Sequence, residues 1–210
     1  MRSSFILLAI VARVMSCGFS NAQEASSSPS VSAEEEKQIE WPSPDGKFGF
    51  IRVEFTESED SVSKLDLVET ESKKVVLHIA KEEDLALHWH VLWAPDSKRF
   101  ALMTRSGHPA QELHVYATDG HTFREVELPK LEAKIPERLK RGKKYPHVGN
   151  LNWQEATEWK KDGSLVVEIE TAIDGESGTV AAKRTVVLGF DRSGEARILN
   201  STIKYETEKE

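Results

Sequence analysis

The amino-acid sequence predicts an all-β fold, and three observations lead to this prediction. Apolar and polar side chains alternate with the period of two that is typical of strands. Pairs of Asp or Ser with Gly, which favour tight turns, separate these alternating runs. A tryptophan followed by an Asp turn recurs three times, and such internal repeats indicate similar structural units. We therefore expect antiparallel strands joined in meanders.

The clearest alternation lies between residues 165 and 173. Glu168 and Glu170 occupy one predicted face there, whereas the other face carries Leu165, Val167, Ile169, Thr171 and Ile173. Turns are expected at Asp45-Gly46, Asp119-Gly120, Asp162-Gly163, Asp174-Gly175 and Ser193-Gly194, because Gly tolerates positive φ and Asp bonds to nearby backbone. The resulting strands are expected near residues 48–55, 63–69, 74–79, 87–93, 98–104, 112–118, 122–128, 151–159, 164–173, 182–190 and 196–204.

The repeated segments are Trp41–Phe48, Trp93–Phe100 and Trp159–Leu165. The first has one additional residue between Trp and Asp, the second has Ser97 where Gly is expected, and the third has Lys161 where Pro is expected. Each repeat predicts a strand that ends in Trp, an Asp turn and three further strands. Trp41, Trp93 and Trp159 are accordingly predicted to anchor the cores of these units.

These segments resemble the WD-like, TolB-type β-propeller repeat, whose signature is a strand ending Trp-Ser-Pro-Asp-Gly-Lys. The resemblance is strongest at residues 41–50 and 93–102, and it extends over about residues 39–204. It implies meandering, antiparallel, four-stranded blade-like units, and it carries no catalytic residues. Closed propellers typically have about 4–8 blades, so three units predict a partial or open β-propeller in one chain. A ring shared by two chains and a β-sandwich are the alternatives.

The N-terminal residues predict an exported protein. Arg2, an apolar run at residues 5–12 and the small residues Ser20-Asn21-Ala22 are typical of a signal peptide over residues 1–22. No transmembrane span is expected, because spanning needs about 20 apolar residues. Residues 23–40 are interpreted as a disordered tether, residues 41–204 as a single all-β domain, and residues 205–210 as a tail. We expect a periplasmic or extracellular location.

Val14-Met15-Ser16-Cys17 offers a second processing site, because it resembles a bacterial lipobox. Cys17 would then carry a lipid anchor, and the protein would be an outer-membrane lipoprotein. Cys17 is the only cysteine, so cleavage at either site leaves no other thiol for metal, redox or nucleophilic chemistry. Removal of residues 1–22 takes away two arginines and lowers the formal charge from −7 to −9. This acidic balance argues against a nucleic-acid partner.

Residues 129–150 form a basic insertion that we predict to be a long surface loop, with a short helix limited by Pro136. Seven basic and two acidic side chains give it a formal charge of +5. Such a patch suits a protein or an anionic ligand, and the residues predicted to bind it are Lys140, Arg141, Lys143, Lys144 and Tyr145. The alternative is a solvated loop whose charges pair with the acidic domain.

His88 and His90 flank Trp89, and residues two apart in a strand face the same way. The two imidazoles therefore form a candidate metal site, for which Asp84, His78, His108 and His114 are candidate third ligands. The alternative is strand alternation, with Trp89 in the core and both histidines in solvent.

The sequence lacks a Gly-x-Ser-x-Gly elbow, a P-loop and a Gly-x-Gly-x-x-Gly motif. No catalytic residues and no cofactor are predicted. The leading hypothesis is a non-enzymatic, exported binding module, and the alternative is a metal-dependent hydrolase that uses His88 and His90.

Overall fold

The computed structural model describes residues 38–55, 62–80, 86–106, 110–120, 122–140, 151–175, 178–191 and 194–207. All of these residues belong to one compact unit, Glu36–Glu210. The predicted signal peptide, Cys17, most of the predicted tether and the end of the predicted tail lie outside the described residues.

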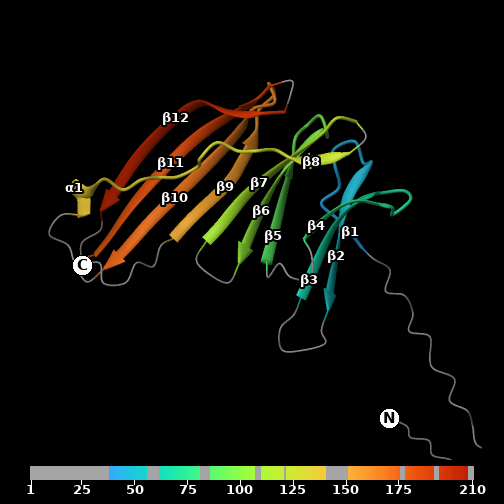
Figure 1. The fold of residues 1–210 in the computed structure, drawn as a ribbon, viewed down its shortest axis with the longest axis horizontal. Helices are drawn as coiled ribbons and strands as arrows, with labels where there is room; N and C mark the ends of the chain where they lie inside the picture. The colour runs from blue at the N-terminus through green and yellow to red at the C-terminus, as the bar shows by residue number, and fades with distance from the viewer. Residues whose placement is uncertain are drawn as a thin grey trace, which may run out of the picture. The chain divides into compact units, whose positions relative to one another are not determined.

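The described strands form three consecutive four-stranded antiparallel meanders (Figure 1). The first unit contains β1 (Ile39–Glu40), β2 (Phe48–Phe55), β3 (Val62–Glu69) and β4 (Val75–Ala80). The second contains β5 (Ala86–Trp93), β6 (Arg99–Ser106), β7 (Ala110–Thr118) and β8 (Phe123–Glu125). The third contains β9 (Leu151–Trp159), β10 (Leu165–Gly175), β11 (Gly178–Phe190) and β12 (Ala196–Thr207). The predicted all-β fold with four-stranded antiparallel units is confirmed, and each expected strand is present.

The three units are distributed over two sheets. The first unit is a separate sheet with the strand order β1-β2-β3-β4, and the other two units share a larger sheet with the order β12-β11-β10-β9-β7-β6-β5. A short parallel pairing joins these two units, with Ala110 opposite Asn152 and Gln111 opposite Trp153. β8 pairs with β7 farther along, at residues 116–118. Neither sheet closes on itself, so the second and third units form one continuous open sheet.

Two apolar cores lie on opposite sides of the larger sheet. Alternation along β6 directs Phe100 and Leu102 toward the first sheet, and Ala101 and Met103 to the other side. The first core contains Phe50, Leu65, Leu67, Trp89, Val91, Phe100, Leu102, Tyr116 and Phe123. The second core continues across β10 and β11 through Leu165, Val167, Ile169, Val180, Ala182, Val186 and Leu188. As predicted, the repeated tryptophans are core residues: Trp41 and Trp93 pack against the first core, and Trp159 lies in the second.

The three Asp turns share one backbone geometry despite their sequence differences. Gly46, Ser97 and Gly163 occupy the equivalent position, and their φ angles are 71°, 56° and 80°. Their N–H groups donate to the carbonyl oxygens of the residues three positions earlier, over 2.8, 2.9 and 2.9 Å. Trp41 has a φ of 44° in the turn that contains the additional residue. Positive φ is unfavourable for residues with a Cβ atom, so Ser97 and Trp41 are held there by the surrounding structure.

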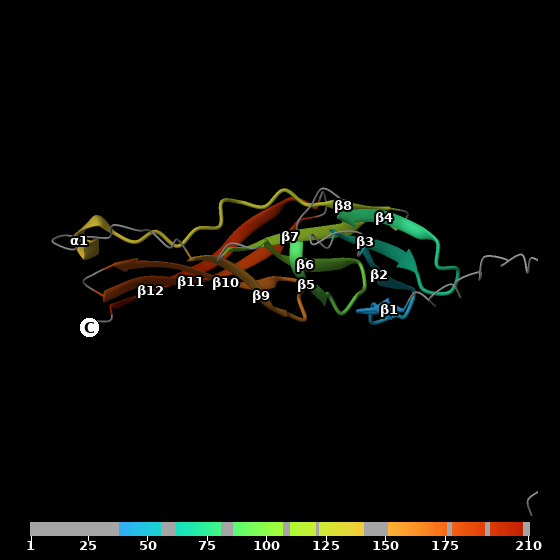
Figure 2. The ribbon, with the colours of Figure 1, turned by 90° about the horizontal axis from the view of Figure 1, so that it is seen from below.

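Residues 126–140, the covering segment, run along one face of β9–β12 (Figure 2). Leu131, Ala133 and Ile135 are buried in the second core, and Arg184 Nη1 donates to the Glu132 carbonyl oxygen over 3.0 Å. The first part of the insertion thus covers the core, which differs from the predicted surface loop. Its residue types are tolerated in helices, so the sequence did not indicate the alternation by which every second side chain is buried. The predicted short helix is present as α1 (Glu137–Lys140), directly after Pro136.

The helical part of the described chain is limited to four residues in α1. No helix within the described ranges has the length and apolar character needed to cross a membrane.

Candidate functional site

The face of β9–β12 opposite the second core is polar. Its character follows from strand alternation: the side chains that alternate with Val167 and Ile169 on β10 are Glu168 and Glu170, as the sequence predicted. The same alternation directs Lys183 and Thr185 of β11 away from the core. The covering segment packs on the core side. We call the opposite face of β9–β12, which carries these polar side chains, the open face.

Strand register assembles the open face into two rows. Antiparallel pairing sets Glu168 opposite both Glu155 and Thr185, and it sets Glu170 opposite both Trp153 and Lys183. On β12, Thr202 extends the first row from Thr185, and Lys204 extends the second from Lys183. Neighbouring side chains in such rows are about 4.5–5.5 Å apart at Cβ, close enough to contact one ligand together.

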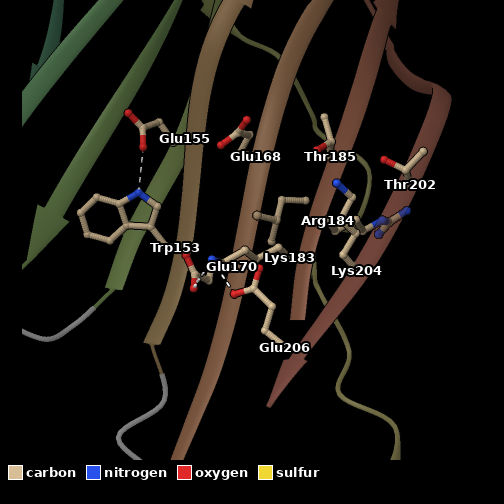
Figure 3. A pocket seen from close by; sticks show the side chains of 11 residues that line it. Trp153, Glu155, Glu168, Glu170, Lys183, Arg184, Thr185, Thr202, Lys204 and Glu206 are labelled. Carbon is tan, nitrogen blue, oxygen red and sulfur yellow. Dashed lines mark hydrogen bonds and ion pairs between the residues drawn. The ribbon is translucent and has the colours of Figure 1, made fainter. Parts of the chain in front are cut away.

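These rows line a shallow groove of about 310 Å³ (Figure 3). At one end, Trp153 Nε1 donates to Glu155 Oε2 over 3.1 Å. The guanidinium of Arg105 from β6 lies 5.6 Å from the centroid of the same indole. Lys183 Nζ lies 2.8 Å from Glu206 Oε2 and 3.8 Å from Glu170 Oε1. The groove thus combines a half-buried aromatic ring with oriented carboxylates and an ammonium group.

Several polar groups in the groove have no partner among the described residues. Within the described ranges, no hydrogen bond or ion pair engages the side chains of Glu168, Thr185, Thr202 or Lys204. Moreover, Glu168 lies opposite Glu155, and Lys204 lies opposite Lys183. Like charges placed directly across an antiparallel pair are destabilising. Fold stability therefore does not account for this arrangement, whereas a bound polar ligand would use it.

The predicted basic site is described only at its first residue. Lys140 lies in α1, and its Nζ is 2.8 Å from Glu137 Oε1. Arg141, Lys143, Lys144 and Tyr145 lie outside the described residues, so their binding role stays a prediction. The described part of the insertion also pairs its charges internally. The Nζ atoms of Lys134 and Lys130 lie 2.8 and 3.1 Å from Glu132, and their hydrogen bonds lower the pKa of that carboxyl.

His88 and His90 are exposed on either side of the buried Trp89, as the alternation interpretation expected. Two candidate third ligands are occupied: His78 Nδ1 lies 2.6 Å from Asp66, and His114 Nδ1 lies 2.7 Å from Glu125. The other two, Asp84 and His108, lie outside the described ranges. No group of three potential metal ligands gathers in the part of the chain that the structure describes.

A second, wider depression of about 690 Å³ lies among the turns of the second and third units. Its central cation, Arg99, is fully engaged in the fold. The Arg99 guanidinium lies 5.3 Å from the Trp159 ring and 5.2 Å from the Phe190 ring, and Nη1 donates to the Gly163 carbonyl oxygen over 3.1 Å. Acidic side chains surround it, including Asp96, Asp119 and Glu195. We therefore interpret this depression as a structural junction between the units.

Local patterns in the sequence did not predict the groove on the open face. Trp153 and Glu155 alternate with the buried Ala156 on β9, in the same manner as Glu168 and Glu170 alternate with buried residues on β10. The alternation is visible in each strand separately, but the register between neighbouring strands from β9 through β12 is needed to bring the polar side chains into one groove.

Comparison of the chain with models of protein families and with curated proteins finds no match.

Proposed function

We propose that the protein is an exported, non-enzymatic binding module, and that it holds a saccharide in the groove on the open face of β9–β12. The observation that supports this proposal is the combination of the Trp153 ring with unpaired polar groups in one shallow groove. The predicted signal peptide supports export to the periplasm or the cell exterior. The predicted lipid anchor at Cys17 would hold the same domain at a membrane surface.

The chemistry of the groove suits a saccharide. Sugar hydroxyls both donate and accept hydrogen bonds, and the groove offers matching hydroxyl groups (Thr185 and Thr202), a carboxylate (Glu168) and an ammonium group (Lys204). The indole of Trp153 supplies an apolar surface with a polar edge, which suits the C–H faces of a sugar ring.

The rigidity of the groove also supports a binding role. Its side chains come from strands of one continuous sheet rather than from loops, so the backbone holds them in fixed register. Sites built on strands are more precisely positioned than sites built on loops. Because the side chains are preorganised, they lose less conformational entropy when a ligand binds.

The proposal is tested with the full chain on an immobilised panel of neutral and acidic oligosaccharides, followed by calorimetric titration of the strongest binder. We expect Trp153→Ala to weaken binding at least about tenfold, because a lost aromatic contact and its neighbouring contacts amount to about 1.4 kcal/mol or more. Glu168→Ala should weaken binding through loss of its hydrogen bonds. Glu158→Ala is the matched control, because Glu158 is exposed on the same strand as Trp153 and does not line the groove.

Two results would reject the proposal. One is the absence of binding to every member of the panel by a folded wild-type protein. The other is that the Trp153→Ala and Glu168→Ala variants bind the saccharide as tightly as the Glu158→Ala control does. Charge reversal at Lys140, Arg141, Lys143 and Lys144 is measured in the same assay. It should weaken binding of a ligand held by the predicted basic site and leave binding of a ligand in the groove unchanged.

A further inference from the structure

The strand β12 forms one edge of the larger sheet and exposes several large apolar side chains. It runs for 12 residues, and it is the last strand in the order of the sheet. Within the described ranges, no strand pairs with its outer side. The exposed large hydrophobic side chains on β12 are Ile198, Leu199, Ile203 and Tyr205, with 36%, 52%, 40% and 38% of their surface accessible.

Three of these side chains, Ile198, Ile203 and Tyr205, continue the second core beyond its last covered strand. Register sets Ile198 opposite the buried Leu188, and Tyr205 opposite the buried Ala182. Ile203 lies opposite Arg184, whose guanidinium holds the covering segment through the Glu132 carbonyl. The core face is therefore covered as far as β11 and remains open on β12. A long unpaired edge with apolar side chains is a template for pairing with another strand.

We propose that β12 pairs in antiparallel fashion with β12 of a second copy of this chain, across a two-fold axis at Tyr205. The strand is self-complementary about this residue, because Lys204 and Glu206 lie on either side of it. Antiparallel pairing centred on Tyr205 places each Lys204 opposite the Glu206 of the second copy, and it brings the two Tyr205 rings together. Opposite charges and aromatic pairs at such positions each stabilise a sheet by about 0.2–1 kcal/mol.

The local contacts leave these groups available for this pairing. Lys204 has no hydrogen bond or ion pair within the described ranges. Glu206 contacts Lys183 through Oε2, which leaves its other carboxylate oxygen to accept from the second copy. The same pairing sets Ile203 opposite Thr207 and removes apolar surface of Ile203 and Tyr205 from water. A closed two-fold interface of this kind is the commonest form of homo-oligomer.

The pairing would place the two open faces on the same side of one continuous sheet, because a two-fold axis perpendicular to a sheet preserves its faces. It shares Lys204 and Glu206 with the groove, but it does not rest on the saccharide proposal, since its tests measure the mass and the cross-linking of the protein and not saccharide binding. The two hypotheses therefore fail separately.

The first test measures the mass of the full chain by sedimentation velocity over a wide range of concentration. We expect a concentration-dependent dimer. Lys204→Glu and Glu206→Lys should each weaken the dimer at least about tenfold, because each replaces two reciprocal attractions with two repulsions. The double variant Lys204→Glu/Glu206→Lys should restore dimerisation, because the opposite charges face each other again. A merely destabilised fold would not be restored by the second charge change.

The second test reads the register directly in a chain that also carries Cys17→Ser. Tyr205→Cys should give a covalent dimer under mild oxidation, because residues on the axis face each other at a Cα separation that a disulfide can bridge. Glu158→Cys, on β9, should remain monomeric under the same conditions. Wild-type protein that stays monomeric at every concentration would overturn the proposal. So would a dimer that is insensitive to both charge reversals and is not cross-linked by Tyr205→Cys.

Discussion

The indole N–H of Trp93 donates a hydrogen bond to the carbonyl oxygen of Trp41 over 2.9 Å, which joins the repeated tryptophans of the first and second units. Trp159 continues the pattern, because its indole N–H donates over 2.9 Å to the carbonyl oxygen of Leu92, the residue before Trp93. Each later tryptophan is therefore bonded to the strand end of the preceding unit. The repeat thus specifies contacts between units as well as the core of each unit.

Trp93→Phe should lower the free energy of unfolding by more than Trp41→Phe. Both changes remove an indole, but only the first removes a donor between units, since Trp41 contributes its backbone carbonyl, which the substitution keeps. The lost hydrogen bond contributes about 0.5–1.5 kcal/mol. Urea denaturation of both variants and the wild type measures the difference. Equal losses in the two variants would show that the bond contributes nothing to the contact between units.

Ser97 should respond to different degrees to two small substitutions. Its Oγ accepts a hydrogen bond from the Asp45 backbone N–H over 3.0 Å, and its φ of 56° is unfavourable for any residue with a Cβ atom. Ser97→Ala removes the acceptor and keeps the strain, so it should destabilise by about 1 kcal/mol. Ser97→Gly also removes the acceptor but relieves about 1 kcal/mol of strain, so it should be more stable than Ser97→Ala. Chemical denaturation that ranks the alanine variant above the glycine variant would contradict this explanation.

Ile135→Ala should destabilise the fold by about 2–4 kcal/mol, because it removes a buried side chain and leaves a cavity under the covering segment. Lys134→Ala, at the adjacent exposed position, removes only a surface ion pair with Glu132 and should change stability by less than about 1 kcal/mol. Thermal unfolding of the two variants provides the comparison. Similar small effects at both positions would contradict a role of this segment in the core.

Asp162 should make stability depend on pH in the acidic range. Hydrogen bonds from the Ser164 hydroxyl and backbone N–H, over 2.7 and 3.0 Å, lower the pKa of Asp162 from its ordinary value of 3.8. A carboxyl with a lowered pKa contributes stability above its unfolded pKa, and this contribution is lost as the pH falls through the folded pKa. Asp162→Asn should therefore be less stable than the wild type at neutral pH, and the gap should narrow below about pH 4. Urea denaturation between neutral and strongly acidic pH measures this gap, and a constant gap would refute the linkage.

Local signals in the sequence were sufficient to predict the strands. The alternation at residues 165–173 and the Gly-containing turns depend on neighbours along the chain, so each strand could be placed without knowing its partners. The parallel pairing of Ala110 and Gln111 with Asn152 and Trp153 joins residues far apart in sequence, and no local pattern indicates it. For the same reason the sequence did not show that the second and third units share a sheet.

The burial of the covering segment was also beyond local inference. Leu131, Ala133 and Ile135 alternate with the charged residues Glu132 and Lys134, a pattern that fits a solvated loop equally well. Only the apolar surface of β10 and β11 beneath them, which the tertiary structure supplies, decides that these three side chains are buried.

By itself, the sequence determined the all-β class, the positions of the strands and turns, and the three four-stranded units, because these depend on short-range periodicity and turn chemistry. The tertiary structure alone decided which face of β9–β12 is covered, and hence that Trp153, Glu168 and Lys204 line one groove. It also decided that Ile203 and Tyr205 continue an apolar face at an edge with which no described strand pairs. Strand register and sheet order create both surfaces, and they are set by the packing of residues that the chain keeps far apart.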